Sequence, residues 1–258
     1  MFSFFKKKDK NEPVVVIKPT EEFDDVMPIA DYFHNETGVT FDRQESILKN
    51  KVVSFCRRRE IYSFSNLLER VKSDSQLKQE LIDHLTTNET FFYREVKQIE
   101  QLTKLVKEKN SSVDILCAPS ATGEEPYSIA ISLLEAGVAP SKISILGIDI
   151  NSDAISKAKV AQYGERNVRN LSSDILNNYF VKEDDKYALK DSVKSLVSFK
   201  IINIFDESFR NLGKFDFIFS RNMLIYFNKE TKLKAKGILE SMRKTDEYDV
   251  FFGHADLY

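Results

Sequence analysis

The stretch of sequence that decides the fold runs from Val113 to Asn151 and reads VDILCAPSATGEEPYSIAISLLEAGVAPSKISILGIDIN. It opens with a short apolar run, passes through a loop of small residues into a helical pattern over 124–136, and closes with a second apolar run over 142–150. Two strand-like runs joined by a helix of more than ten residues predict a right-handed crossover between two parallel strands. This segment is therefore expected to form the first half of an α/β domain.

The same alternation continues on both sides of this stretch. Further buried strands are expected over 196–205, 215–220 and 249–254, and helices over 96–109, 152–160 and 229–243. Strands that alternate with helices predict a mainly parallel, doubly wound α/β sheet covered on both faces. Upstream, residues 21–85 show only helical periodicity, in segments 21–35, 41–60, 63–72 and 76–85. We therefore expect a flexible tail (1–20), an all-α domain (21–85) and an α/β domain (86–258).

Composition excludes several classes of protein. Of 258 residues, 42% are hydrophobic and 12% aromatic, which is enough for a sizeable core and too apolar for a disordered chain. A net charge of −2 gives no support for a nucleic-acid-binding protein. The two cysteines and three histidines are scattered, so neither a metal site nor a disulfide framework is expected. No apolar run approaches the ~18 residues of a membrane span, and we expect a cytoplasmic protein that is not embedded in a membrane.

A ligand of an open parallel sheet binds beyond the carboxyl ends of its strands. The loop after the first strand holds a single glycine, Gly123, followed by Glu124 and Glu125 at the start of the helix. Carboxylates at a helix start are common as caps, but here they would also repel a pyrophosphate. Asp149, at the end of the second strand, lies where an acidic side chain binds ribose hydroxyls. An adenosyl ligand without phosphates is S-adenosylmethionine (SAM), and the residues favour it over a dinucleotide.

Four motifs in order make the chain recognisable: TTNETFFYRE (86–95), SATGEEPYSIAI (120–131), GIDIN (147–151) and FDFIFSRNMLIYF (215–227). Together they resemble the CheR family, the glutamate methyltransferases of chemotaxis receptors, over roughly residues 22–254. The resemblance implies a Rossmann-like, SAM-dependent methyltransferase domain, which carries a small antiparallel β-subdomain at about 171–200. It also implies SAM as methyl donor and S-adenosylhomocysteine as product.

The resemblance also implies roles for individual residues. Arg94 and Tyr226 match positions beside the transferring methyl group, Glu125 meets the methionyl amino group, and Asp149 binds the ribose. The sequence leaves open whether Arg94 orients the acceptor carboxylate or the carboxylate of SAM itself. The cofactor-binding set that it implies is Asn88, Thr90, Arg94, Glu125, Asp149, Asn203, Ile204, Arg221 and Asn222. The acceptor, a glutamate with a reference pKa of about 4.3, is already ionised at neutral pH, so no general base is needed. The motifs accordingly contain no histidine.

The implied partner is the cytoplasmic helical domain of a chemoreceptor, to whose membrane arrays the protein would be recruited. The segment 41–60 carries six basic residues against three acidic ones. It is either an ordinary solvated helix face or a docking surface for an acidic partner. The docking residues expected are Lys49, Lys51, Arg57, Arg58 and Arg59. The stretch 180–199 contains no glycine, whereas family members that grip a receptor tether carry a Gly-containing loop there. A tether-independent enzyme is therefore expected.

Two other functions remain open from the sequence: a SAM-binding or S-adenosylhomocysteine-binding regulatory module without methyl transfer, and a small-molecule methyltransferase. The chain departs from the family pattern at Cys117 and Pro119, which could reshape the pocket. The sequence also ends on FFGHADLY (251–258), without the hairpin that usually closes this fold. A truncated sheet edge is therefore expected.

Overall fold

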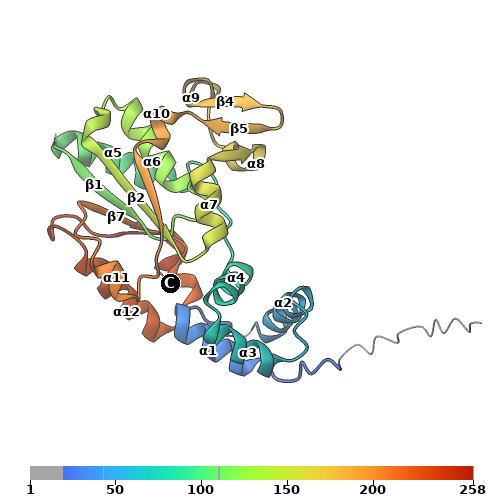
Figure 1. The fold of residues 1–258 in the computed structure, drawn as a ribbon. Coiled ribbons are helices and arrows are strands. Elements are labelled where there is room, and N and C mark those ends of the chain that lie inside the picture. Colours follow the sequence, from blue (N-terminus) through green and yellow to red (C-terminus); the bar gives the residue numbers. More distant parts are fainter. Residues whose placement is uncertain (1–19, 43, 110, 258) are drawn as a thin grey trace, which may run out of the picture.

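The computed structural model describes residues 20–42, 44–109 and 111–257. The expected flexible tail, apart from Thr20, lies outside these residues. Five parallel strands form the main sheet in the order β6-β2-β1-β7-β8, and the chain reverses its direction across the sheet between β1 and β7 (Figure 1). The strands are β1 (Val113–Cys117), β2 (Ile143–Asp149), β6 (Val197–Ile201), β7 (Phe217–Ser220) and β8 (Phe251–Phe252). The doubly wound α/β architecture is confirmed.

Helices cover both faces of this sheet because successive strand residues point to opposite sides. Ile115 and Cys117 join the hydrophobic core on one face, and Leu116 joins the core on the other. The first face is covered by α5 (Val96–Lys109), α6 (Glu124–Glu135), α7 (Ser152–Val160) and α10 (Asp191–Lys194). The second is covered by α11 (Glu207–Arg210) and α12 (Lys229–Ser241). Three short 3-10 helices complete the domain: η1 (Pro140–Lys142), η2 (Leu224–Tyr226) and η3 (His254–Asp256).

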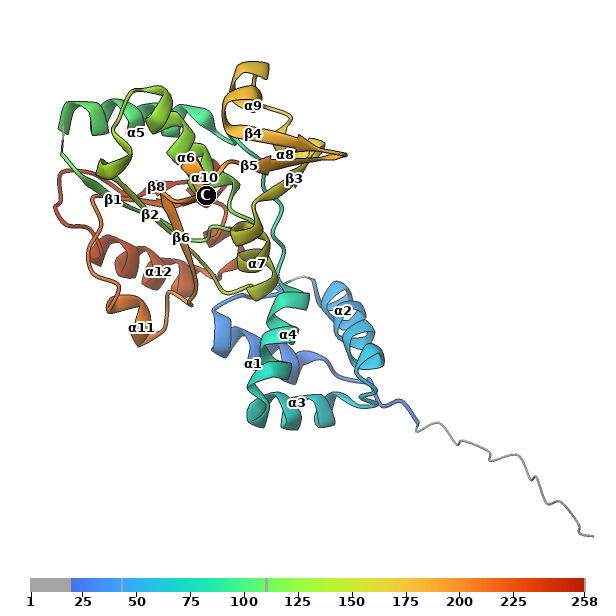
Figure 2. The same ribbon diagram turned by 45° about the horizontal axis from the view of Figure 1, so that its top comes forward.

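A small antiparallel sheet with the order β3-β5-β4 stands beside the main sheet (Figure 2). Its strands are β3 (Gln162–Gly164), β4 (Phe180–Glu183) and β5 (Lys186–Leu189). The chain between β3 and β4 forms the short helices α8 (Glu165–Val168) and α9 (Ser173–Tyr179). The antiparallel strands thus begin before the expected start at about 171, and the end of the expected range, 197–200, belongs to the main sheet. The three residues of β3 are too few to show a strand alternation, and their partner β5 lies more than twenty residues further along the chain.

The N-terminal helices pack around their own apolar core. They are α1 (Met27–Thr37), α2 (Glu45–Arg58), α3 (Phe64–Ser73) and α4 (Ser75–Leu85). Side-chain caps start two of them, since Ser63 accepts the N–H of Asn66 and Asp74 accepts that of Leu77. The helix expected from residue 21 begins only at Met27. Pro28 suits the first turn of a helix and would break its interior, so the helix starts there.

The helical domain joins the α/β domain at the carboxyl ends of the strands (Figure 1). The loop after α1 donates a hydrogen bond from Thr40 N to the Tyr226 carbonyl at 2.8 Å. Gly38, with φ of 78°, lies so close to the Phe205 ring that a side chain would collide with it. Helix α4 contacts α7. No helix in the described ranges is long and apolar enough to cross a membrane.

Candidate active site

A cavity of about 410 Å³ opens where the two domains meet. Its walls come from the loops after β1, β2, β6 and β7, from segment 85–94 and from the end of α1. This volume suits a small ligand. The cavity brings together all ten residues expected to bind the cofactor or to act on the methyl group: Asn88, Thr90, Arg94, Glu125, Asp149, Asn203, Ile204, Arg221, Asn222 and Tyr226. Their placement is what a shared site requires, and their individual roles stay predictions.

Asp149 ends β2 with a buried carboxylate on the cavity wall. One of its oxygens accepts the N–H of Ala121 and the other accepts that of Asn151, both at 2.9 Å. Burial raises the pKa of this carboxyl group to about 6, although the backbone donors oppose the shift. Each carboxylate oxygen can accept a further hydrogen bond. The group can therefore bind hydroxyls in the cavity while the backbone fixes its orientation.

The loop after β1 is held close to β2. Ser120 N donates to the Ile148 carbonyl at 2.7 Å, and a side chain at Gly147 would come within 2.8 Å of the Ser120 Cβ. Gly123 precedes α6 with φ of 94°, a left-handed conformation that favours glycine. Both glycines therefore allow the loop to pack closely against its neighbours, and neither lines the cavity.

The two glutamates that follow have different surroundings. Glu124 is fully buried and accepts hydrogen bonds from Thr122 Oγ1 and Asn167 Nδ2, both at 2.6 Å. Asn167 also accepts the N–H of Phe92 on its backbone carbonyl, at 2.8 Å. Burial raises the pKa of Glu124. Glu124 therefore holds the TTNETFFYRE segment in place and is absent from the residues that line the cavity.

Glu125 instead lines the cavity and forms a buried ion pair with Arg221 Nε through its Oε2 atom. Its other oxygen, Oε1, is buried and has no hydrogen-bond partner among the residues that the structure describes. Burial raises the pKa of Glu125, and the charge of Arg221 opposes that shift. An unsatisfied buried carboxylate oxygen is costly. It is the acceptor that a ligand ammonium group, such as the methionyl amino group of SAM, would satisfy.

Arg94, Asn222 and Tyr226 form another part of the wall. Arg94 Nη2 donates to Asn222 Oδ1 at 3.0 Å and Nη1 donates to the Glu89 carbonyl at 3.2 Å. In the described part of the chain, these two hydrogen bonds use two of the five guanidinium N–H donors. Tyr226 is partly exposed at the cavity. Burial raises the pKa of its hydroxyl group, while the charge of Arg94 opposes that shift.

A buried carboxylate that the sequence did not point to supports this wall. Asp256 accepts the backbone N–H groups of Asn222 and Leu224, the latter at 2.8 Å, and that of Gly253 at 3.2 Å. Asn222 has φ of 59°, and a side chain at Gly253 would lie 2.8 Å from Asp256 Oδ2. Strand β8, two residues long, leads into this segment and pairs with β7. Asp256 therefore orients the loop that presents Asn222 to Arg94.

The Asn203 side chain has a structural task that its sequence position does not reveal. Its amide nitrogen donates to the Glu36 carbonyl at 2.9 Å and its oxygen accepts the N–H of Phe205 at 3.0 Å. The side chain thus fastens the end of α1 to the loop after β6. The buried Ile204 follows it on the cavity wall.

The five expected docking residues lie outside the cavity, on α2 and its C-terminal cap, Arg59. Lys49 Nζ donates to the Asp24 carbonyl at 2.8 Å, and Lys51 Nζ donates to that of Leu85 at 3.3 Å. The three arginines contact three different groups: Arg57 pairs with Glu21, Arg58 with His84 and Arg59 with Glu80. Because Glu21 and Glu80 come from outside 41–60, the charge of this surface is smaller than the local sequence suggests.

The site's composition defines a class of protein. Three features fit a SAM-dependent methyltransferase. The strand order of the parallel sheet reverses between β1 and β7, and a carboxylate lies at the end of β2. A buried carboxylate oxygen also lies, unpaired among the described residues, where an amino group would bind. Within the ranges that the structure describes, no group of three or more His, Cys, Asp or Glu side chains is placed to hold a metal ion.

Comparison with known proteins gives the family. Residues 24–86 match the CheR methyltransferase all-alpha domain and residues 88–257 match the CheR methyltransferase SAM binding domain. The chain belongs to the CheR methyltransferase family. It is 38% identical over 224 residues to a chemotaxis protein methyltransferase of Campylobacter jejuni, covering 86% of this chain and 84% of that protein. It is 31% identical over 250 residues to one of Borreliella burgdorferi, covering 90% and 88%. SAM is therefore the cofactor of this domain, as the residues around Asp149 predicted.

Proposed function

We propose that this protein transfers the methyl group of SAM to glutamate side chains in the cytoplasmic helical domain of chemotaxis receptors, giving glutamate methyl esters. Family membership and the named relatives support a SAM-dependent methyltransferase of chemotaxis. The observation that carries the acceptor assignment is Arg94, which lies on the wall that holds Tyr226. Three of its guanidinium N–H donors have no hydrogen-bond partner among the described residues. A cation at this point favours an anionic acceptor.

Bound SAM supplies an electrophilic methyl group on a sulfonium. The chain's residues then have to hold and orient two substrates. Asp149 would accept the ribose hydroxyls, Glu125 Oε1 would accept the amino group, and the backbone at Asn203 and Ile204 would face the adenine. Arg94 would align the acceptor carboxylate, and Tyr226 would pack beside the reacting centre. No residue has to remove a proton, because the acceptor is ionised at neutral pH. Positioning and exclusion of water therefore provide the catalysis.

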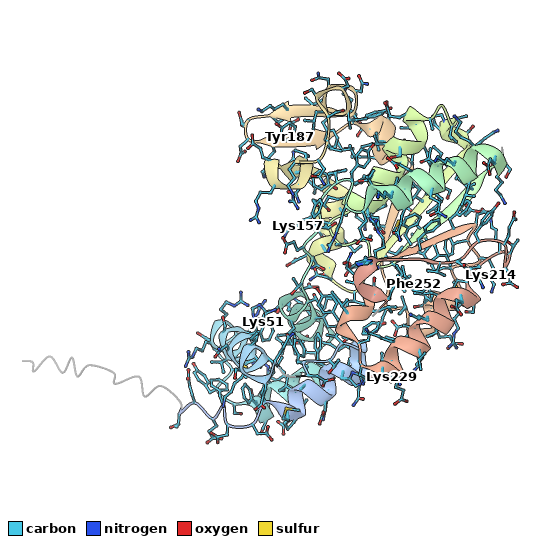
Figure 3. All side chains as sticks on the ribbon, turned by 180° about the vertical axis from the view of Figure 1, so that it is seen from behind. Lys51, Lys157, Tyr187, Lys214, Lys229 and Phe252 are labelled. Carbon is cyan, nitrogen blue, oxygen red and sulfur yellow. The ribbon has the colours of Figure 1, made fainter. Side chains whose placement is uncertain are left out.

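The acceptor helix would reach the cavity from the side of α2. Lys51 on α2 lies on the same side of the molecule as Lys157 on α7 and Tyr187 on β5 (Figure 3). The hairpin between β4 and β5 turns in two residues, Asp184 and Asp185, so the small sheet has no long loop with which to grip a receptor tether. This supports docking through the basic residues of α2 and methylation that does not depend on a tether.

The test is methylation of receptor-containing membranes with SAM labelled in its methyl group. We expect label in the receptor band that is released as methanol by mild base, because esters are base-labile and amides or ethers are not. Arg94→Ala is the matched variant and should lose most of this label while it still binds SAM. Tight SAM binding by the wild-type chain without base-labile label would refute the proposal and indicate a regulatory SAM-binding module.

A further inference from the structure

The turn that follows Asp149, the carboxylate proposed to bind the ribose, is held by the other domain. Residues 150–152 follow Asp149 directly and lead from β2 into α7. Asn151 is 2% exposed, and its backbone N–H binds Asp149 Oδ1 at 2.9 Å. Any movement of this turn therefore changes the orientation of the Asp149 carboxylate.

Helix α4 of the helical domain contacts each of the three residues in this turn. The Gln79 amide donates to the Ile150 carbonyl at 2.8 Å. The carboxylate of Asp83 accepts the Ser152 backbone N–H at 2.7 Å and the Ser152 hydroxyl at 2.5 Å. The Asn151 amide donates to the Asp83 carbonyl at 3.1 Å.

The contacts support each other. Gln79 also donates to Asp83 Oδ1 at 2.8 Å, so the two side chains, one helical turn apart, form one unit on a single face of α4. Asn151 reaches one step further and donates to Thr86 Oγ1 at 2.7 Å, at the start of the segment that lines the cavity. The Asp83 carboxylate lies at the N-terminus of α7, where a negative charge is favourable. This unit links the ribose side of the cavity to the segment that leads to Asn88.

We propose that Gln79 and Asp83 are positioning residues for SAM: they act across the domain junction, through the 150–152 turn, to fix the Asp149 carboxylate for the ribose. Neither residue lines the cavity. The helical domain is then a working part of the cofactor site as well as a carrier of the receptor-docking residues. This inference rests on the proposed binding of the SAM ribose by Asp149 and not on the identity of the methyl acceptor.

The neighbouring face of the same helix provides a matched control. Glu80 follows Gln79 directly but pairs with Arg59 on the α2 side, at 2.5 Å. Glu80→Gln removes a charge and an ion pair from the same turn of α4 without touching the junction with α7. A general weakening of α4 would affect both variants, whereas loss of positioning would affect only those at Gln79 and Asp83.

The experiment is calorimetric titration of SAM into the full chain, with no acceptor present. For Asp83→Ala we expect Kd to rise about threefold to thirtyfold, the range for residues that act on a site without touching its ligand. Glu80→Gln should stay within about twofold of the wild type. Ser152→Ala should weaken SAM binding, and its effect should be less than additive with that of Asp83→Ala, because the two side chains share one contact. Asp83→Asn keeps an acceptor for the Ser152 N–H and should rescue part of the loss.

The kinetic readout separates positioning from mere stability. With SAM saturating, kcat of Asp83→Ala should approach the wild-type value while KM for SAM stays raised, because Asp83 contacts neither the methyl group nor the acceptor. If Asp83→Ala does not fold, Asp83→Asn and Gln79→Ala provide the same comparison. A folded Asp83 variant that binds SAM as tightly as the wild type would overturn the proposal. An equal loss in Glu80→Gln would do the same.

Discussion

The affinity for SAM should depend on pH through Asp149, and the structure sets the size of the effect. Burial raises the pKa of this carboxyl group from 3.8 to about 6 in the free protein. Ribose hydroxyls donate hydrogen bonds, so SAM binds the ionised form. At pH 7 about nine-tenths of the protein is in that form, and at pH 5 about one-tenth is. Kd should therefore rise roughly tenfold as the pH falls from 7 to 5. If the pKa of Asp149 were 3.8, Kd would rise by less than about 10% over the same pH range.

Calorimetric titration of SAM at intervals between pH 5 and pH 7 measures this profile. The amino group of SAM stays protonated over this range, since α-amino groups titrate near 7.7–8.0. Glu125 also has a raised pKa, so the matched control is Asp149→Asn, in which Glu125 still titrates. This variant should bind SAM about one to two orders of magnitude more weakly at pH 7. It should also lose the part of the profile that Asp149 causes.

Stability does not explain the expected loss in that variant. The pKa of Asp149 is higher in the folded than in the unfolded chain, so ionising this group opposes folding as the pH rises from about 4 to 6. Asp149→Asn removes that cost, and its Tm at pH 7 should not fall for this reason. If wild type and variant gave parallel Kd profiles between pH 5 and pH 7, Asp149 would not be the ribose-binding carboxylate.

Three further predictions concern the acceptor side. Tyr226→Phe should lower kcat by a larger factor than it raises Kd for SAM. Equal factors for kcat, from activity assays, and for Kd, from calorimetry, would show that Tyr226 mainly binds the cofactor. Reversal of the charges of Arg57, Arg58 and Arg59 by substitution with glutamate should raise the KM for receptor and leave SAM binding unchanged. Added salt should likewise raise the wild-type KM for receptor without affecting SAM binding. An unchanged KM for receptor in the triple variant would exclude this docking surface. Asp256→Asn should lower kcat through the 222–224 loop; a variant of wild-type activity and Tm would show that this loop needs no such support.

The order of elements could be predicted from the sequence because each depends on local periodicity. The helices 96–109 and 152–160 have the same bounds in the structure as in the sequence analysis. The short strand β3 could not be predicted, because its pairing with β5 depends on residues more than twenty positions away. The start of α1 could have been placed correctly from Pro28 alone.

The residues of the site also fall into two groups, those that the sequence predicts and those that depend on tertiary contacts. Asp149 and Glu125 follow from strand ends and from the family motifs, and the cavity contains both. Asp83 looks like an ordinary polar residue on an amphipathic helix, and its partners in the 150–152 turn come from the packing of α4 against α7. Asp256 likewise acts on a loop more than thirty residues before it. Contacts of this kind depend on tertiary structure, for which a single sequence carries no local signal.

The measurement that tests the central claim most directly is peptide mass spectrometry of a receptor's cytoplasmic helical fragment after incubation with this protein and SAM. We predict that specific glutamates gain the mass of one CH2 group, that mild base removes it, and that S-adenosylhomocysteine appears in equal amount. Arg94→Ala should leave the same peptides unmodified. Receptor glutamates that stay unmodified while the protein binds SAM, or a gain in mass that resists base, would contradict the assignment of glutamate methyl-ester formation to this cavity.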